Sequence, residues 1–147
     1  MLEELREPSP GDPSPGDPSA DGCWLERDFT EGDLPRLRVL AEEFATWAGL
    51  PVARRGEFVL AVNEVVSNAI THGGGRGRLM LRRTDGEVQC RVTDAGPGFS
   101  VAVIPELLPG LDSHCGRGLW LARLVTDRLT VGAGVVGAVV TLAIRLG

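Results

Sequence analysis

The spacing of apolar residues is helical in the first half of the chain. Five of them recur every three or four residues, namely Leu37, Leu40, Ala41, Phe44 and Trp47. This spacing predicts a helix with Asp33 as its N-cap, Pro35 in its first turn and Gly49 at its end. A second apolar stripe predicts another helix from about residue 54 to residue 71, and three consecutive glycines, 73 to 75, then end it.

The period changes after these glycines. Leu79 and Leu81 alternate with more polar neighbours, as do Val88, Cys90 and Val92, and such alternation predicts two strands. The intervening Asp-Gly pair at 85–86 indicates a two-residue hairpin. Similar patterns predict an edge strand over 25–29, closing strands over 129–131 and 136–146, a helix over 118–126 and a flexible loop over 99–115.

These elements predict an α+β fold. Helices would cover one face of a mixed, mostly antiparallel sheet in a two-layer sandwich. Asp94 continues the alternation of the strand before it. We therefore expect its side chain on the covered face of the sheet. An aspartate of an ordinary surface loop would not need to follow the alternation of the strand.

Composition indicates one domain and a tail. The chain has 147 residues, of which 43% are hydrophobic. Residues 1–23 contain a tandem Pro-Ser-Pro-Gly-Asp repeat and predict a disordered segment, whereas 24–147 predict the folded domain. The absence of a long apolar run and of a basic, apolar leader predicts a cytoplasmic protein.

Charge and cysteines narrow the function classes. A formal net charge of -5 argues against a large nucleic-acid interface, which usually needs a basic face. The three cysteines show no paired spacing, so neither a disulfide framework nor a zinc site is expected.

A polar pair interrupts the second predicted helix. Glu64 and Asn68 lie four residues apart within an otherwise apolar stretch, so both point to the same side. A solvated helix face is the common explanation for such a pair. A carboxylate with an amide oxygen also suits Mg²⁺ and its waters, and asparagine is a poor residue for a helix interior.

Two glycine motifs follow. Asp94, Gly96 and Gly98 form an Asp-x-Gly-x-Gly turn, which is either an ordinary strand exit or a site where the carboxylate accepts a hydrogen bond from the amine of adenine. Gly116-Arg117-Gly118 at the start of a helix is either a tight turn or a phosphate site built on free N–H groups, with Arg117 as a possible phosphate partner.

In this order and separation, the three motifs resemble the ATP-binding domain of the gyrase, histidine-kinase and mismatch-repair ATPases, the Bergerat fold. Residues 64–68 match its N box, residues 94–99 its first glycine box, and residues 116–119, ending in Leu119, its second. The resemblance covers roughly residues 25–146. The small anti-sigma-factor serine kinases of bacteria are most similar, and no helical hairpin with a phosphoacceptor histidine precedes the N box.

The resemblance implies specific roles. Glu64 would be the general base, Asn68 the magnesium ligand, Asp94 the adenine contact and 99–115 the ATP lid. Gly96, Gly98, Gly116, Arg117, Gly118 and Leu119 would complete the ATP site. One departure is visible: the family's last strand usually begins with Gly-Thr, whose hydroxyl supports the aspartate, and Gly137-Ala138 stands here.

Three functions follow from the motifs and remain open at this stage. The first is a protein-serine kinase that phosphorylates an antagonist protein and sequesters a sigma factor, with ATP and Mg²⁺ as cofactors and a possible homodimer. The second is a non-catalytic nucleotide-binding module for protein interactions. The third is a degenerate scaffold that binds no nucleotide.

Overall fold

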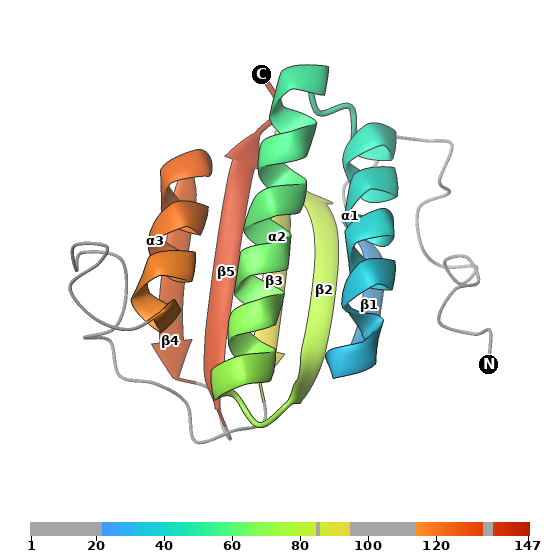
Figure 1. Ribbon diagram of the computed structural model, residues 1–147. Coiled ribbons are helices and arrows are strands. Elements are labelled where there is room, and N and C mark those ends of the chain that lie inside the picture. Colours follow the sequence, from blue (N-terminus) through green and yellow to red (C-terminus); the bar gives the residue numbers. More distant parts are fainter. Residues whose placement is uncertain (1–21, 85, 95–113, 134–136) are drawn as a thin grey trace.

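The protein folds as three helices packed on one face of a five-stranded sheet (Figure 1). The computed structural model describes residues 22–84, 86–94, 114–133 and 137–147, with 114–117 and 133 described by their backbone alone. The strands are β1 (Gly22–Thr30), β2 (Arg76–Thr84), β3 (Glu87–Asp94), β4 (Arg128–Ala133) and β5 (Ala138–Arg145). The helices are the short 3₁₀ turn η2 (Glu31–Asp33), α1 (Leu34–Ala48), α2 (Val52–His72) and α3 (His114–Val125).

The strand order is β1-β2-β3-β5-β4. All four pairings are antiparallel, so the described sheet lacks the parallel component that the sequence left open. The predicted α+β sandwich is confirmed. β1 lies at one edge, as expected, and its first two residues belong to the segment that composition had assigned to the tail.

Alternation places one face of the sheet in the core. In β3, Val88, Cys90, Val92 and Asp94 are all buried, whereas the residues between them are partly or fully exposed. The same face of β5 contributes Val140, Leu142 and Ile144. The expectation that Asp94 lies on the covered face is therefore confirmed, because the strand keeps its parity up to its last residue.

The helices bury the predicted stripes against this face. The core of α1 and α2 includes Leu37, Phe44, Phe58, Ala61 and Val65. Trp24, Trp47, Phe44 and Phe58 form a chain of tilted ring contacts with centroids 5.5 to 6.2 Å apart. These contacts fasten β1 and α1 to the middle of the molecule.

Helix boundaries differ from the sequence prediction in two places. Asp33 precedes α1, but its carboxylate accepts a hydrogen bond of 2.8 Å from the backbone N–H of Thr30 and makes no side-chain cap to α1. The 3₁₀ turn places the acid opposite Thr30 instead. Helix α3 begins at His114, four residues before the predicted start, so the last two residues of the expected loop are helical.

The other boundaries agree with the prediction. Gly49 ends α1 with a left-handed φ of 91°, which only glycine adopts without strain. Gly86 has a φ of 77° in the β2–β3 hairpin. The expected tail up to residue 21 and the expected loop over 99–113 lie outside the described residues.

Candidate functional site

The last turn of α2 meets the end of β3 at Asp94, which is 5% exposed. Gly73, the C-cap of α2, makes this meeting possible. A β-carbon on Gly73 would lie 2.5 Å from Cβ of Asp94 and 2.6 Å from the carbonyl oxygen of Ala69. No side chain fits in that gap, so the absence of a β-carbon sets how closely the helix approaches the aspartate.

The start of β5 closes the other side of Asp94. The backbone N–H of Ala138 donates a hydrogen bond of 3.2 Å to Oδ1 of Asp94. A β-carbon on the preceding Gly137 would collide with the same oxygen and with the backbone of Asp94. The aspartate is thus held between two glycines, and one of its oxygens receives a main-chain donor.

This geometry bears on the departure noted in the sequence. The methyl group of Ala138 offers no hydroxyl, yet the residue's own N–H contacts the carboxylate directly. A buried carboxylate needs donors, because an unsatisfied buried acceptor costs ~1–3 kcal/mol. The backbone supplies one such donor without a threonine.

Asn68 lies one turn before the end of α2 and is 6% exposed. No hydrogen bond joins its side-chain amide to another residue in the described part of the chain, and the amide is not among the fully buried polar atoms that lack a partner. An amide oxygen that no neighbour occupies is suited to a hard cation that otherwise keeps water and phosphate oxygens as ligands. The residue therefore fits a magnesium ligand, while the described residues contain no cluster of three or more His, Cys, Asp or Glu side chains that would hold a metal alone.

Glu64 is half-buried on the same side of α2, one turn earlier. Burial raises the pKa of its carboxyl above the usual 4.5, because the charged form loses hydration. Gly118 of α3 faces it, and a β-carbon there would lie 3.0 Å from Oε1 of Glu64. The close approach of α3 helps to shield the acid from water.

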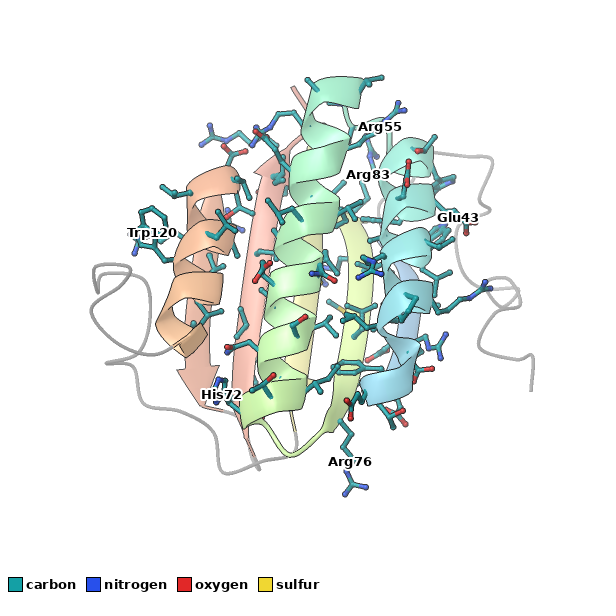
Figure 2. All side chains as sticks on the ribbon, viewed as in Figure 1. Glu43, Arg55, His72, Arg76, Arg83 and Trp120 are labelled. Atoms are coloured by element: carbon teal, nitrogen blue, oxygen red, sulfur yellow. The ribbon has the colours of Figure 1, made fainter. Side chains whose placement is uncertain are left out.

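Polar side chains from two segments of the chain thus lie along α2 and at its end. Glu64 and Asn68 point along its length, and Asp94 lies at its end beside Gly73. His72, the last residue of the helix, is exposed at this end (Figure 2). Figure 1 shows the first turn of α3 at the same end of the molecule as the last turn of α2.

The phosphate motif lies inside the first turns of α3. Gly116 and Arg117 are the third and fourth residues of the helix, so their N–H groups are among the four that a helix start leaves without an internal partner. An anion is favoured at such a position. Leu119 is fully buried in the core, so its side chain anchors α3 to the rest of the molecule and does not face a ligand.

Sequence reasoning also missed part of the site. Gly73 and Gly137, which flank Asp94, were seen as a helix stop and as a family position without a structural role. The sequence signal that could have identified them is a glycine directly at the end of α2 or the start of β5, close to a polar motif. Gly96 and Gly98 of the first glycine box lie outside the described residues.

Chemically, the site offers a carboxylate of raised pKa, a buried side-chain amide and a second carboxylate held by a main-chain donor. Such a set can bind a magnesium–nucleotide complex and take up a proton next to it. Within the described part of the chain, no helix has the length and apolarity that crossing a membrane requires.

Comparisons with known proteins bear on the family and the fold. The family model for the histidine kinase-like ATPase domain matches residues 29–144. The signal transduction histidine-protein kinase AfsQ2 of Streptomyces coelicolor is 39% identical over 54 residues, which are 37% of this chain and 10% of that protein. This chain therefore aligns with only about a tenth of that relative.

A solved structure shares the fold. The catalytic domain of histidine kinase ThkA superposes with a TM-score of 0.53 at 18% identity, covering 82% of this chain and 97% of that domain. At this identity the match is informative about architecture alone.

Proposed function

The chain belongs to the histidine kinase-like ATPase domain family, and we propose that it is an ATP-dependent protein-serine kinase of the anti-sigma type. In this proposal it binds ATP with Mg²⁺, phosphorylates a serine of an antagonist protein and sequesters a sigma factor. Two observations support it: Glu64 and Asn68 are one helical turn apart on α2, and Asp94 lies against Gly73 at the end of this helix.

Glu64 supports the transfer step. A general base must be ionised yet basic enough to accept a proton from a serine hydroxyl. Burial raises the pKa of Glu64, which makes its carboxylate a stronger base than an exposed glutamate. The serine oxygen would attack the γ-phosphorus while its proton passes to Glu64 and the β–γ bond breaks, leaving ADP.

Asp94 and Asn68 support nucleotide binding. The Oδ1 of Asp94 already accepts from Ala138, and the carboxylate can accept a further hydrogen bond from the adenine amine. Asn68 would contribute one oxygen to Mg²⁺, whose role is to offset charge on the transferred phosphate. The free N–H groups at the start of α3 would bind the phosphates.

The partner assignments rest on the resemblance of the N box and glycine boxes to the anti-sigma kinases. A sigma factor and its antagonist act in the cytoplasm, so the proposal places this chain there. A homodimer is part of the proposal, because β1 is an edge strand that pairs only with β2 in the described sheet. An open edge is a ready surface for pairing with a second chain.

Ala138 favours a second candidate, a nucleotide-binding interaction module without transfer activity. The residue lacks the hydroxyl that the family's Gly-Thr pair places beside the aspartate. A site with weakened adenine contacts would hold ATP or ADP and a partner protein but turn over poorly.

Transfer of labelled phosphate separates the two candidates. The chain is incubated with γ-labelled ATP, Mg²⁺ and a purified antagonist domain, alongside Glu64→Gln and the control Glu57→Gln, an exposed ion-pair residue of α2. A kinase transfers label, loses about 10²–10⁴-fold in rate in Glu64→Gln and is unchanged in the control. If calorimetry shows tight ATP binding but no label is transferred, the second candidate, the binding module, is supported. If calorimetry shows no ATP binding, both candidate functions are rejected.

A further inference from the structure

No described helix covers the face of the sheet opposite α1, α2 and α3, and this bare face carries an excess of arginine. All three helices cover the other face (Figure 1). Residues between the buried positions of each strand point to the bare face, and strand register aligns Met80, Arg91, Thr141 and Thr130 in one row across it. The neighbouring row contains Arg82, Gln89, Ala143 and Arg128.

Positive charge on this face exceeds the local negative charge. We call Arg82, Arg91, Arg128 and Arg145 the arginine face. Glu87 is paired with Arg145 in register and accepts hydrogen bonds of 3.2 and 2.8 Å from Arg128. It is the one carboxylate on this half of the described sheet.

Among the described residues, no carboxylate contacts the remaining two arginines of this face, Arg82 and Arg91. Arg82 donates to the neutral amide oxygen of Gln89. Arg91 is exposed and has no hydrogen-bond or ion-pair partner among the described residues. Arg78, nearer the other end of the sheet, contacts two carboxylates, Glu26 and Asp28. With these acids counted, Arg78 and the four residues of the arginine face still exceed Glu26, Asp28 and Glu87 by two charges.

The negative charge of the chain is concentrated in the segment that precedes this sheet. Residues 1–21 contain six of the 20 acidic residues and one of the 15 basic residues, Arg6. This segment therefore has a charge of -5, equal to that of the whole chain, and residues 22–147 hold 14 acidic and 14 basic residues. The acids of the segment are Glu3, Glu4, Glu7, Asp12, Asp17 and Asp21.

The attachment point brings the segment to the arginine face. It joins the sheet at Gly22, which pairs with Arg83, and Cys23 pairs with Arg82. A stretch of 21 residues reaches up to roughly 70 Å when extended, whereas five strands span only about 20 Å. Every arginine of the face is within reach.

We propose that residues 1–21 dock in cis on the arginine face and cover the bare side of the sheet. Side-chain ion pairs hold the segment, because its five prolines lack the N–H groups needed to add a strand to β1. Exposed ion pairs are individually weak, but a tether gives an effective concentration on the order of millimolar. The acidic segment then competes with any anionic partner for the arginine face. This inference does not depend on the function proposed for the site at α2.

A single introduced lysine tests this contact. The 147 residues contain no lysine, so Arg91→Lys keeps the charge of the face and creates the only lysine amine in this chain. A carbodiimide then links that amine directly to carboxylates that contact it, and peptide mapping by mass spectrometry identifies them. Arg36→Lys is the matched control, an exposed arginine of α1 in the helical layer.

We expect cross-links from position 91 to acids of residues 1–21, at a yield roughly tenfold above that from position 36. Three exposed ion pairs of ordinary strength would together favour the docked state by about this factor. Raising the salt to about 1 M shortens the screening length to ~3 Å and should remove the difference. Circular dichroism confirms that both variants are folded. Mixing ¹⁴N- and ¹⁵N-labelled protein distinguishes the two ways of docking.

Cross-links within one isotopic population support the proposal. Mixed-isotope cross-links would show docking between two copies and would overturn the assignment in cis. Equal yields from positions 91 and 36, or cross-links from position 91 only to acids of the sheet itself such as Glu26, would also overturn it.

Discussion

The contact between Gly73 and Asp94 gives the sharpest test of the site. In Gly73→Ala the new methyl group would lie 2.5 Å from Cβ of Asp94 and 2.6 Å from the carbonyl oxygen of Ala69. Carbon atoms in contact prefer about 3.5–4.0 Å, so Asp94 or the end of α2 must move by about 1 Å. The φ of Gly73 is -111°, which alanine adopts freely, so any effect comes from crowding and not from backbone strain.

Two consequences follow from this displacement. Overpacking of a buried position typically costs about 1–3 kcal/mol, measurable as a lower midpoint of urea unfolding at constant slope. A shift of about 1 Å in a site can also reduce turnover by as much as ~100-fold. Affinity for ATP, measured by calorimetry, should fall together with stability, because either movement changes the position of Asp94 relative to α2.

Gly56→Ala is the matched control on the same helix. No atom lies within 4 Å of the added methyl group, so the substitution should stabilise α2 by about 0.5–1 kcal/mol and leave ATP binding unchanged. If Gly73→Ala unfolds at the wild-type midpoint and binds ATP with wild-type affinity, Asp94 is not held by this contact and the proposed geometry is wrong.

Other predictions address the acids and the departure at β5. Burial raises the pKa of Glu64, so the folded chain holds this proton more tightly than the unfolded chain and loses stability as pH rises from below 4.5 through the raised value. Glu64→Gln should therefore be more stable than the wild type at pH 7 and lose that advantage at pH 4 in urea titrations. For Asp127 the sign is opposite, because the backbone N–H of Arg145 is the main group that lowers its pKa below 3.8. Asp127→Asn should therefore be less stable than the wild type at pH 7, and this difference should disappear as the pH falls through the lowered pKa. Ala138→Thr adds a hydroxyl beside Asp94 and should tighten ATP binding by about 2–10-fold, as one hydrogen bond does, whereas Ala138→Val, equal in shape, should not; equal affinities for the two variants would show that the hydroxyl does not reach the site.

Periodicity was sufficient for the type and order of the elements. Alternation in β3 carries Asp94 to the covered face with Val88 and Cys90, and helical spacing buries Leu37 and Phe44. Both results depend on side-chain direction, which repeats every two or 3.6 residues and needs no information from the rest of the chain.

Boundaries that depend on competing hydrogen bonds were less predictable. Asp33 has the right residue type for a helix cap, but Thr30 offers its N–H at 2.8 Å and takes the carboxylate. Sequence alone does not decide between two nearby donors, because the choice depends on the 3₁₀ turn between them. The start of α3 at His114 was also missed, because the loop predicted over 99–115 contains no strong helix-capping signal before it.

By itself, the sequence determined that an acid and an amide share one side of α2 and that a second acid faces the core. Only the tertiary structure decided what packs against the two acids, namely Gly73 and Gly137 beside Asp94 and Gly118 beside Glu64. Local patterns specify the direction of a side chain, whereas close approach between distant segments depends on how whole elements pack, and a glycine shows its role only when the neighbouring atom is in place.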